Sequence, residues 1–177
     1  MAGLTLRVAQ QDIKNFDTEA LVVGFHENVR PLKRLAGALD WLLCGSLSRL
    51  IISRKLQGRV GDAALLTSRG KIPARKIFLV GLGPVEDRSS VSLSNAAAAA
   101  IETVLKAGVR QAALEYFAAS DIPVETGVPA FCSGMARTIG DRDLDIVILL
   151  PPGAALEKIS HLVTTCAAGT AATPATS

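Results

Sequence analysis

Short apolar runs alternate along this chain with longer segments of helical periodicity. In the first run, Leu4, Leu6 and Val8 alternate with Thr5 and Arg7, which predicts a strand with one solvent-exposed face. Four further runs are apolar on both faces, the pattern of central strands covered on both sides. These runs are residues 20–25, 63–67, 77–81 and 146–150. A sixth strand is predicted at residues 112–117, where Glu115 interrupts the apolar sequence.

The segments between these runs place apolar residues at the 3.6-residue spacing of amphipathic helices. The predicted helices cover about residues 36–51, 93–104, 128–139 and 156–163. The third ends at Gly140, and the fourth follows Pro151-Pro152-Gly153. Helices are therefore available for both faces of a sheet. We predict an α/β protein, a three-layer α/β/α sandwich around a mixed sheet of about six strands.

Composition fits one globular domain. The chain has 177 residues, of which 49% are apolar and 20% charged, a balance that excludes intrinsic disorder for most of its length. We expect a domain at residues 1–166 and a flexible, Ala/Thr-rich tail at residues 167–177.

Cysteine usage and the N-terminal sequence predict a cytoplasmic protein. Cys44, Cys132 and Cys166 contain no C-x-x-C pair, and an odd number cannot complete a disulfide framework. Arg7 and the polar residues 10–12 interrupt the apolar run that a signal peptide requires. We expect no membrane association. Cys132 falls on the apolar stripe of its predicted helix and is expected in the core.

Positive charge is concentrated in the first half of the chain. Residues 1–88 hold 14 Lys or Arg and 8 Asp or Glu, whereas residues 89–177 hold 5 and 8. Eight basic residues between positions 49 and 76 accompany a single acid, Asp62, so nucleic-acid binding through a basic patch is one hypothesis for function. Because only 4% of the residues are aromatic, base stacking has few candidates, and we do not expect a nucleic-acid partner.

Two segments after predicted central strands are candidates for ligand chemistry. Gly81-Leu82-Gly83-Pro84 is a glycine-rich loop of the kind that binds phosphates, but Glu86 stands where a dinucleotide fingerprint requires glycine. His26 follows another central strand, at the edge where open α/β sheets bind ligands. Arg30 replaces the second histidine of an H-E-x-x-H zinc motif. We predict no metal site and no cofactor.

A second stripe on the first predicted helix is a candidate interface. Trp41, Gly45, Ser48 and Ile52 lie nearly opposite the apolar stripe that faces the sheet. Either this helix is buried on two sides, or the second stripe contacts a partner subunit or domain.

Several segments resemble, in order and spacing, the N-terminal domain of the leucyl aminopeptidase family (peptidase M17). They are residues 20–25, 35–40, 61–62 and 76–83, and the similarity extends over about residues 4–150. The resemblance implies a macro-domain-like fold. In that family the two-metal peptidase site lies in a separate C-terminal domain, whose Asn-Thr-Asp-x-Glu-Gly-Arg-Leu signature has no counterpart in this sequence. The resemblance therefore implies a stand-alone noncatalytic copy of the N-terminal domain, which is not an enzyme.

Macro domains bind ADP-ribose, so the resemblance also implies an alternative function in small-ligand binding. Gln11-Asp12-Ile13 resembles the Gly-Asp-Ile segment whose aspartate contacts adenine. The Val-Asn-Ala-Ala-Asn segment that holds the distal ribose is replaced by residues 22–26, which lack asparagine. The candidate ligand residues are Asp12, Gly24, His26, Gly81 and Gly83. Our leading hypothesis is instead a protein-interaction or assembly module that self-associates or docks to a protein partner.

Overall fold

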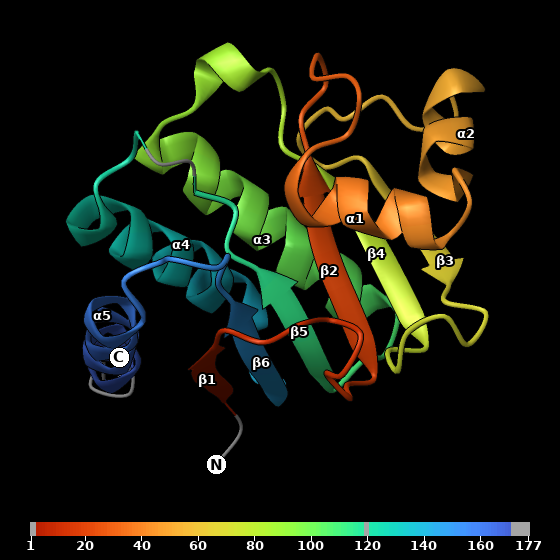
Figure 1. The fold of residues 1–177 in the computed structure, drawn as a ribbon. Coiled ribbons are helices and arrows are strands. Elements are labelled where there is room, and N and C mark those ends of the chain that lie inside the picture. The colour runs from red at the N-terminus through yellow and green to blue at the C-terminus, as the bar shows by residue number, and fades with distance from the viewer. Residues whose placement is uncertain (1–2, 119–120, 171–177) are drawn as a thin grey trace.

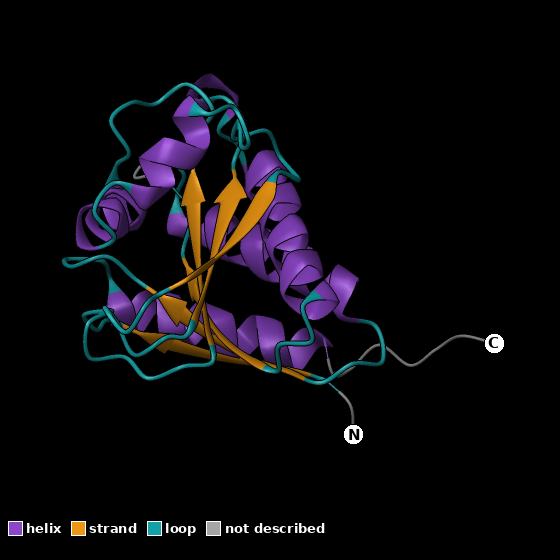
Figure 2. Ribbon diagram, turned by 90° about the vertical axis from the view of Figure 1, so that its right-hand side faces the viewer, coloured by secondary structure: helices purple, strands orange, loops and turns teal. Residues whose placement is uncertain are grey.

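The structure, a computed structural model, describes residues 3–118 and 121–170. Its centre is a six-stranded sheet with helices on both faces (Figure 1). Seen from the side, the twisted sheet lies between these two helical layers (Figure 2). The predicted α/β/α sandwich is confirmed.

The sheet is mixed, with the strand order β1-β6-β5-β2-β4-β3. The strands are β1 (Leu4–Ala9), β2 (Ala20–Phe25), β3 (Ala63–Thr67), β4 (Lys76–Gly81), β5 (Gln111–Glu115) and β6 (Leu144–Leu149). Only β3 is antiparallel to its neighbour, so β1, β6, β5, β2 and β4 end at the same edge of the sheet. Loops that leave this edge come together in space and can form a site.

The described residues also form five α-helices and one short 3-10 helix, η1 (Val85–Asp87). The α-helices are α1 (Arg34–Leu42), α2 (Ser46–Ile52), α3 (Ser90–Lys106), α4 (Val124–Ile139) and α5 (Leu156–Thr170), which follows the last strand. The helices α3, α4 and α5 pack on one face of the sheet, and α1 and α2 on the other. Gly140 ends α4 as predicted, and Ser89, together with Ser92, caps the start of α3.

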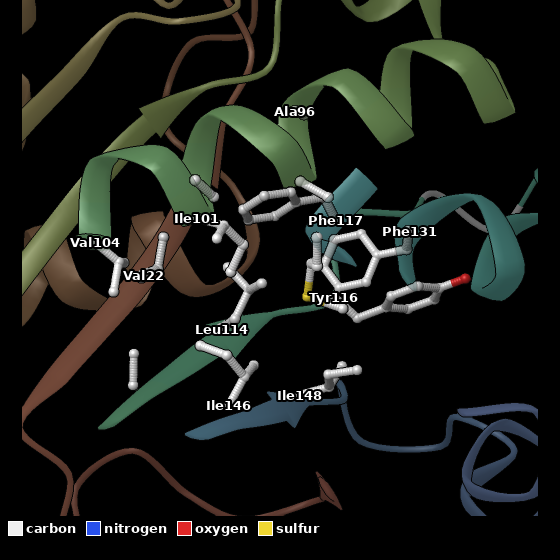
Figure 3. Close-up of a cluster of buried hydrophobic side chains, with 14 of the residues drawn as sticks. Val22, Ala96, Ile101, Val104, Leu114, Tyr116, Phe117, Phe131, Ile146 and Ile148 are labelled. Carbon is white, nitrogen blue, oxygen red and sulfur yellow. The ribbon is translucent and has the colours of Figure 1, made fainter. Parts of the chain in front are cut away.

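A hydrophobic cluster fills each space between the sheet and a helical layer. On the α3–α5 side, Leu114 and Ile146 of the sheet pack with Ile101 and Phe131 of the helices (Figure 3). Phe131 also meets the ring of Tyr116 edge to face, with centroids 5.2 Å apart. Cys132 is buried in this cluster, as predicted. Because β2 and β4 are covered on both faces, their continuous apolar sequences are explained.

The third strand is an edge strand, which corrects the prediction that residues 63–67 form a central one. Ala64 and Leu66 pack against the cluster beneath α1 and α2. The alternate residues Ala63, Leu65 and Thr67 are exposed because no helix covers them. An apolar side chain at Leu65 made the segment resemble a buried strand although one face is open to solvent.

The predicted helix over residues 36–51 is in fact two helices. Cys44 and Gly45 adopt left-handed backbone angles (φ 52° and 75°), and α1 and α2 meet at a bend of 107°. Asp40 stabilises the bend, since its carboxylate accepts hydrogen bonds from Leu47 N, Ser48 N and Ser48 Oγ. Cys44 therefore lies in an exposed turn, not in a helix.

At the C-terminal end, α5 continues to Thr170, so the first residues of the expected tail are helical. Residues 171–177 lie outside the described residues. No single helix in the described part of the chain is long and apolar enough to cross a membrane. Only α1 and α2 together have the length and composition, and they are bent.

Candidate functional site

A pocket of about 840 Å³ opens at the edge where the parallel strands end. Asp12 borders it from the loop after β1, and Pro151 from the loop after β6. Arg34 and Trp41 border it from α1, and Glu115 from the last position of β5. Apolar side chains, among them Leu35 and Leu42, form much of the remaining wall. A largely apolar pocket with a few converging polar groups is the usual form of a binding site.

Glu115 is the buried charged residue of this pocket, with only 5% of its surface exposed. Its Oε1 atom lies 3.3 Å from Arg34 Nε, and its Oε2 atom accepts a hydrogen bond from Gly24 N at 3.1 Å. Burial raises the pKa of the Glu115 carboxyl, while the Arg34 charge and the main-chain N–H groups of Gly24 and Leu35 oppose that rise. The carboxylate thus joins β5, β2 and the start of α1.

Arg34 holds the loop that follows β5. Its guanidinium donates hydrogen bonds to the carbonyl oxygens of Tyr116 (2.6 Å), Phe117 (3.2 Å) and Ala118 (3.3 Å). Arg34 also has a left-handed backbone (φ 54°), a conformation that usually favours glycine. With four partners in the protein, the guanidinium is committed to joining α1 to this loop and has little capacity left for an anion.

Of the five predicted ligand residues, Asp12 lines the pocket and Gly24 contacts it through the Glu115 carboxylate. One oxygen of Asp12, Oδ1, accepts a hydrogen bond from Lys14 N, and the residue is exposed. Its other carboxylate oxygen makes no hydrogen bond to the described residues, so Asp12 retains an acceptor for a ligand.

The other three predicted ligand residues are grouped near the end of β4, away from the pocket wall. His26 Nδ1 lies 3.1 Å from the carbonyl oxygen of Gly83, to which it donates. Burial lowers the pKa of His26. Gly81 has a packing role, because a Cβ atom there would lie 2.1 Å from the carbonyl oxygen of Arg59.

The bend between α1 and α2 divides the predicted interface residues. Trp41 is 86% exposed at the rim of the pocket, and Ile52 is 80% exposed on α2. Ser48 bonds to Asp40, and Gly45 forms the turn. Trp41 and Ile52 therefore contribute exposed apolar surface on two differently oriented helices instead of one stripe.

Sequence reasoning missed the pairing of Arg34 with Glu115. The signal was the single acidic residue in an otherwise apolar strand, which the sequence shows only as an interruption. A buried carboxylate requires a partner, but nothing in the local sequence identifies Arg34 as that partner. Among the described residues, no three His, Cys, Asp or Glu side chains are grouped so that they could hold a metal ion.

Comparison with protein families gives a match to the N-terminal domain of the cytosol aminopeptidase family over residues 22–138. A probable cytosol aminopeptidase of Geobacter sulfurreducens is 32% identical over 144 residues, which cover 81% of this chain and 28% of that protein. One from Gloeothece citriformis is 30% identical over 131 residues, 74% of this chain and 26% of that protein. The chain thus spans about a quarter of the length of these relatives.

Solved structures show the same fold. A variant of tomato leucine aminopeptidase superposes with a TM-score of 0.73 at 20% identity, covering 96% of this chain and 36% of that one. A Trypanosoma brucei macrodomain in complex with ADP superposes with a TM-score of 0.64 at 13% identity, covering 93% and 68%. The macro-domain-like architecture is confirmed.

Proposed function

Because this chain belongs to the cytosol aminopeptidase family and corresponds to its N-terminal domain, we propose that it is a noncatalytic domain acting through protein contacts. The observation that carries the proposal is Trp41, whose side chain is 86% exposed beside an apolar pocket. A large exposed aromatic side chain next to a pocket is typical of the anchors that dominate protein interfaces.

The proposed contact surface consists of Trp41 and the apolar wall formed by Leu35 and Leu42. Its partner is a second copy of this chain or a chain that carries the catalytic domain of the family. The names of the relatives support the cytoplasm as the compartment.

Trp41→Glu tests this surface. If Trp41 is buried in an assembly, a carboxylate there has to be desolvated without a partner, and the assembly should dissociate. Native mass spectrometry of the unaltered protein should show an oligomer, and the variant should show the mass of one subunit. Val91→Glu is the matched control, since Val91 is an exposed apolar residue on α3, on the other face of the sheet.

An unchanged oligomer in Trp41→Glu would contradict the role of this surface. A single subunit in the unaltered protein would exclude self-association. The partner would then be a chain that carries the catalytic domain. To test this, that chain is mixed separately with the unaltered protein and with Trp41→Glu, and native mass spectrometry shows which mixture forms a complex.

Small-ligand binding is a second candidate function, favoured by the 840 Å³ pocket and by the free acceptor of Asp12 at its wall. The macrodomain neighbour in complex with ADP supports a nucleotide as the ligand class. The commitment of Arg34 to protein carbonyls weighs against phosphate binding. An added mass of a nucleotide in the native spectrum, lost in Asp12→Ala, would favour this function over the contact surface.

A further inference from the structure

The outer edge of β3 carries main-chain groups without a strand partner. In the antiparallel pairing with β4, Gly81 N donates to Asp62 O at 2.9 Å, which makes Ala63 the first residue that exchanges no hydrogen bonds with β4. Alternation then directs the N–H and C=O groups of Ala63, Leu65 and Thr67 away from β4. No strand within the described residues pairs with this side.

A groove of about 760 Å³ runs between this edge and α2. Both elements lie on the right of Figure 1. Four basic residues line the groove, Arg49 and Lys55 from the α2 side and Arg69 and Lys71 from the loop after β3. No acidic residue lines it, and none of the four basic residues forms an ion pair with a described residue. The groove is therefore a concentration of uncompensated positive charge.

Apolar side chains are exposed in the same groove. Ile52 is 80% exposed and lines the groove. Leu65 borders it at the strand edge, and its side chain, 55% exposed, lies on the face of β3 opposite α2. An edge strand with free main-chain groups, apolar contacts and one sign of charge has the three features of a site for strand addition. We propose that the β3 edge accepts an extended acidic segment of a partner protein as an added strand.

The charge of the groove decides between possible occupants. A second copy pairing edge to edge would bring two sets of four cations together, which is unfavourable. A single-stranded nucleic acid has the required negative charge, but none of the described residues that line the groove is aromatic, so its bases have nothing to stack on there. A peptide with alternating acidic and apolar residues matches both the cations and the apolar positions.

This inference rests on the proposed role in protein contacts but uses a different surface from Trp41. The two have separate readouts, subunit mass for Trp41→Glu and peptide affinity for the β3 edge. An oligomer that dissociates in Trp41→Glu, together with no peptide binding, would reject the strand-addition site alone.

The test is fluorescence anisotropy with a labelled peptide of alternating Glu and Val residues. The unaltered protein should bind it, and a peptide of alternating Lys and Val should not bind because its charges repel the groove. An alternating Glu and Val peptide that is N-methylated at consecutive amides keeps the charge but has methyl groups on both edges, so neither edge can pair as a strand. Its affinity should be lower by about tenfold or more, since several main-chain hydrogen bonds are lost.

Leu65→Pro tests the same site from the protein side. Proline removes the outward N–H of Leu65 but no hydrogen bond to β4, because Leu65 pairs with Phe78 at a position without hydrogen bonds. Leu65→Thr is the matched control that shortens the side chain and keeps the N–H. We expect affinity to fall by about tenfold in Leu65→Pro relative to Leu65→Thr.

Equal binding of the methylated and unmethylated peptides by the unaltered protein would overturn the proposal, whether or not Leu65→Pro folds. If the two peptides bind equally and oligothymidylate also displaces them, the groove is a general site for polyanions. Concentration-dependent dimerisation lost in Leu65→Pro, without peptide binding, would identify a second copy as the occupant and would also overturn it.

Discussion

Gly134→Ala is expected to lower the free energy of unfolding by about 3 kcal/mol, because α3 and α4 touch through their backbones at this position. A Cβ atom on Gly134 would lie 2.1 Å from the carbonyl oxygen of Ser94 and 2.8 Å from its carbonyl carbon. Main-chain atoms within α3 cannot rotate away as a side chain can. The two helices would have to separate, and the cluster around Phe131 and Met135 would lose contacts.

Whether Gly134→Ala raises or lowers the free energy of unfolding shows how closely α3 and α4 approach each other. In an unconstrained helix, replacing glycine by alanine is stabilising by about 1 kcal/mol, so a loss shows that the close approach outweighs helix propensity. Urea denaturation of both proteins measures the difference. Ser133→Ala, at an exposed neighbouring position of α4, should change the stability by less than about 0.5 kcal/mol. A gain in stability for Gly134→Ala would show that the helices are farther apart than described.

The alternation of apolar runs and helical segments was sufficient to predict the layered fold, because each signal is local. Residues 20–25 form β2 with the predicted bounds, and the spacing after them leaves room for a crossover helix. The edge position of β3 could not be predicted in this way. β3 is an edge strand because only β4 pairs with it, and Leu65 is exposed because no helix covers its side of the strand. Both properties depend on residues far away in the sequence.

The break between α1 and α2 shows a different limit of sequence reasoning. Apolar periodicity continues through Leu43 and Leu47, which suggested one helix. The bend depends on the left-handed conformation of Cys44, a residue with no preference for it, and on Asp40 capping the next helix. Gly45 was the only local sign of a turn. As a result, Trp41 and Ile52, which were predicted to lie on one stripe of one helix, lie on two helices.

Four of the five candidate ligand residues lie at or just after the ends of the central strands β2 and β4, and Asp12 follows the edge strand β1, but only Asp12 borders the pocket. The glycines illustrate why. Gly81 ends a strand like a ligand-binding glycine, yet its missing side chain makes room for the carbonyl oxygen of Arg59. A sequence shows where a glycine is, and the fold shows what approaches it.

Glu115→Ala is expected to lower the free energy of unfolding at pH 7 by about 3 kcal/mol. The substitution removes the acceptor for the buried N–H of Gly24 and the carboxyl group that faces Arg34, and it leaves a cavity beneath the pocket. Denaturant unfolding monitored by circular dichroism provides the measurement. Glu115→Gln is the matched control, because its side-chain oxygen can still accept one hydrogen bond, and it should lose less. Equal stability of Glu115→Ala and the unaltered protein would show that the carboxylate does not hold these elements together.

A comparison of the unaltered protein with Glu115→Gln shows whether burial or the Arg34 charge has the stronger effect on the pKa of the Glu115 carboxyl. Burial raises the pKa of Glu115 above 4.5, so the folded state holds this proton at a pH where the unfolded state releases it. The stability contributed by the protonated form is then complete below pH 4.5 and is lost as pH rises through the raised pKa. The stability difference between the unaltered protein and Glu115→Gln should therefore shrink as pH rises from 4.5 through the raised pKa, since their other titrating groups are shared. A difference that grows over this range would mean that the Arg34 charge outweighs burial and holds Glu115 ionised.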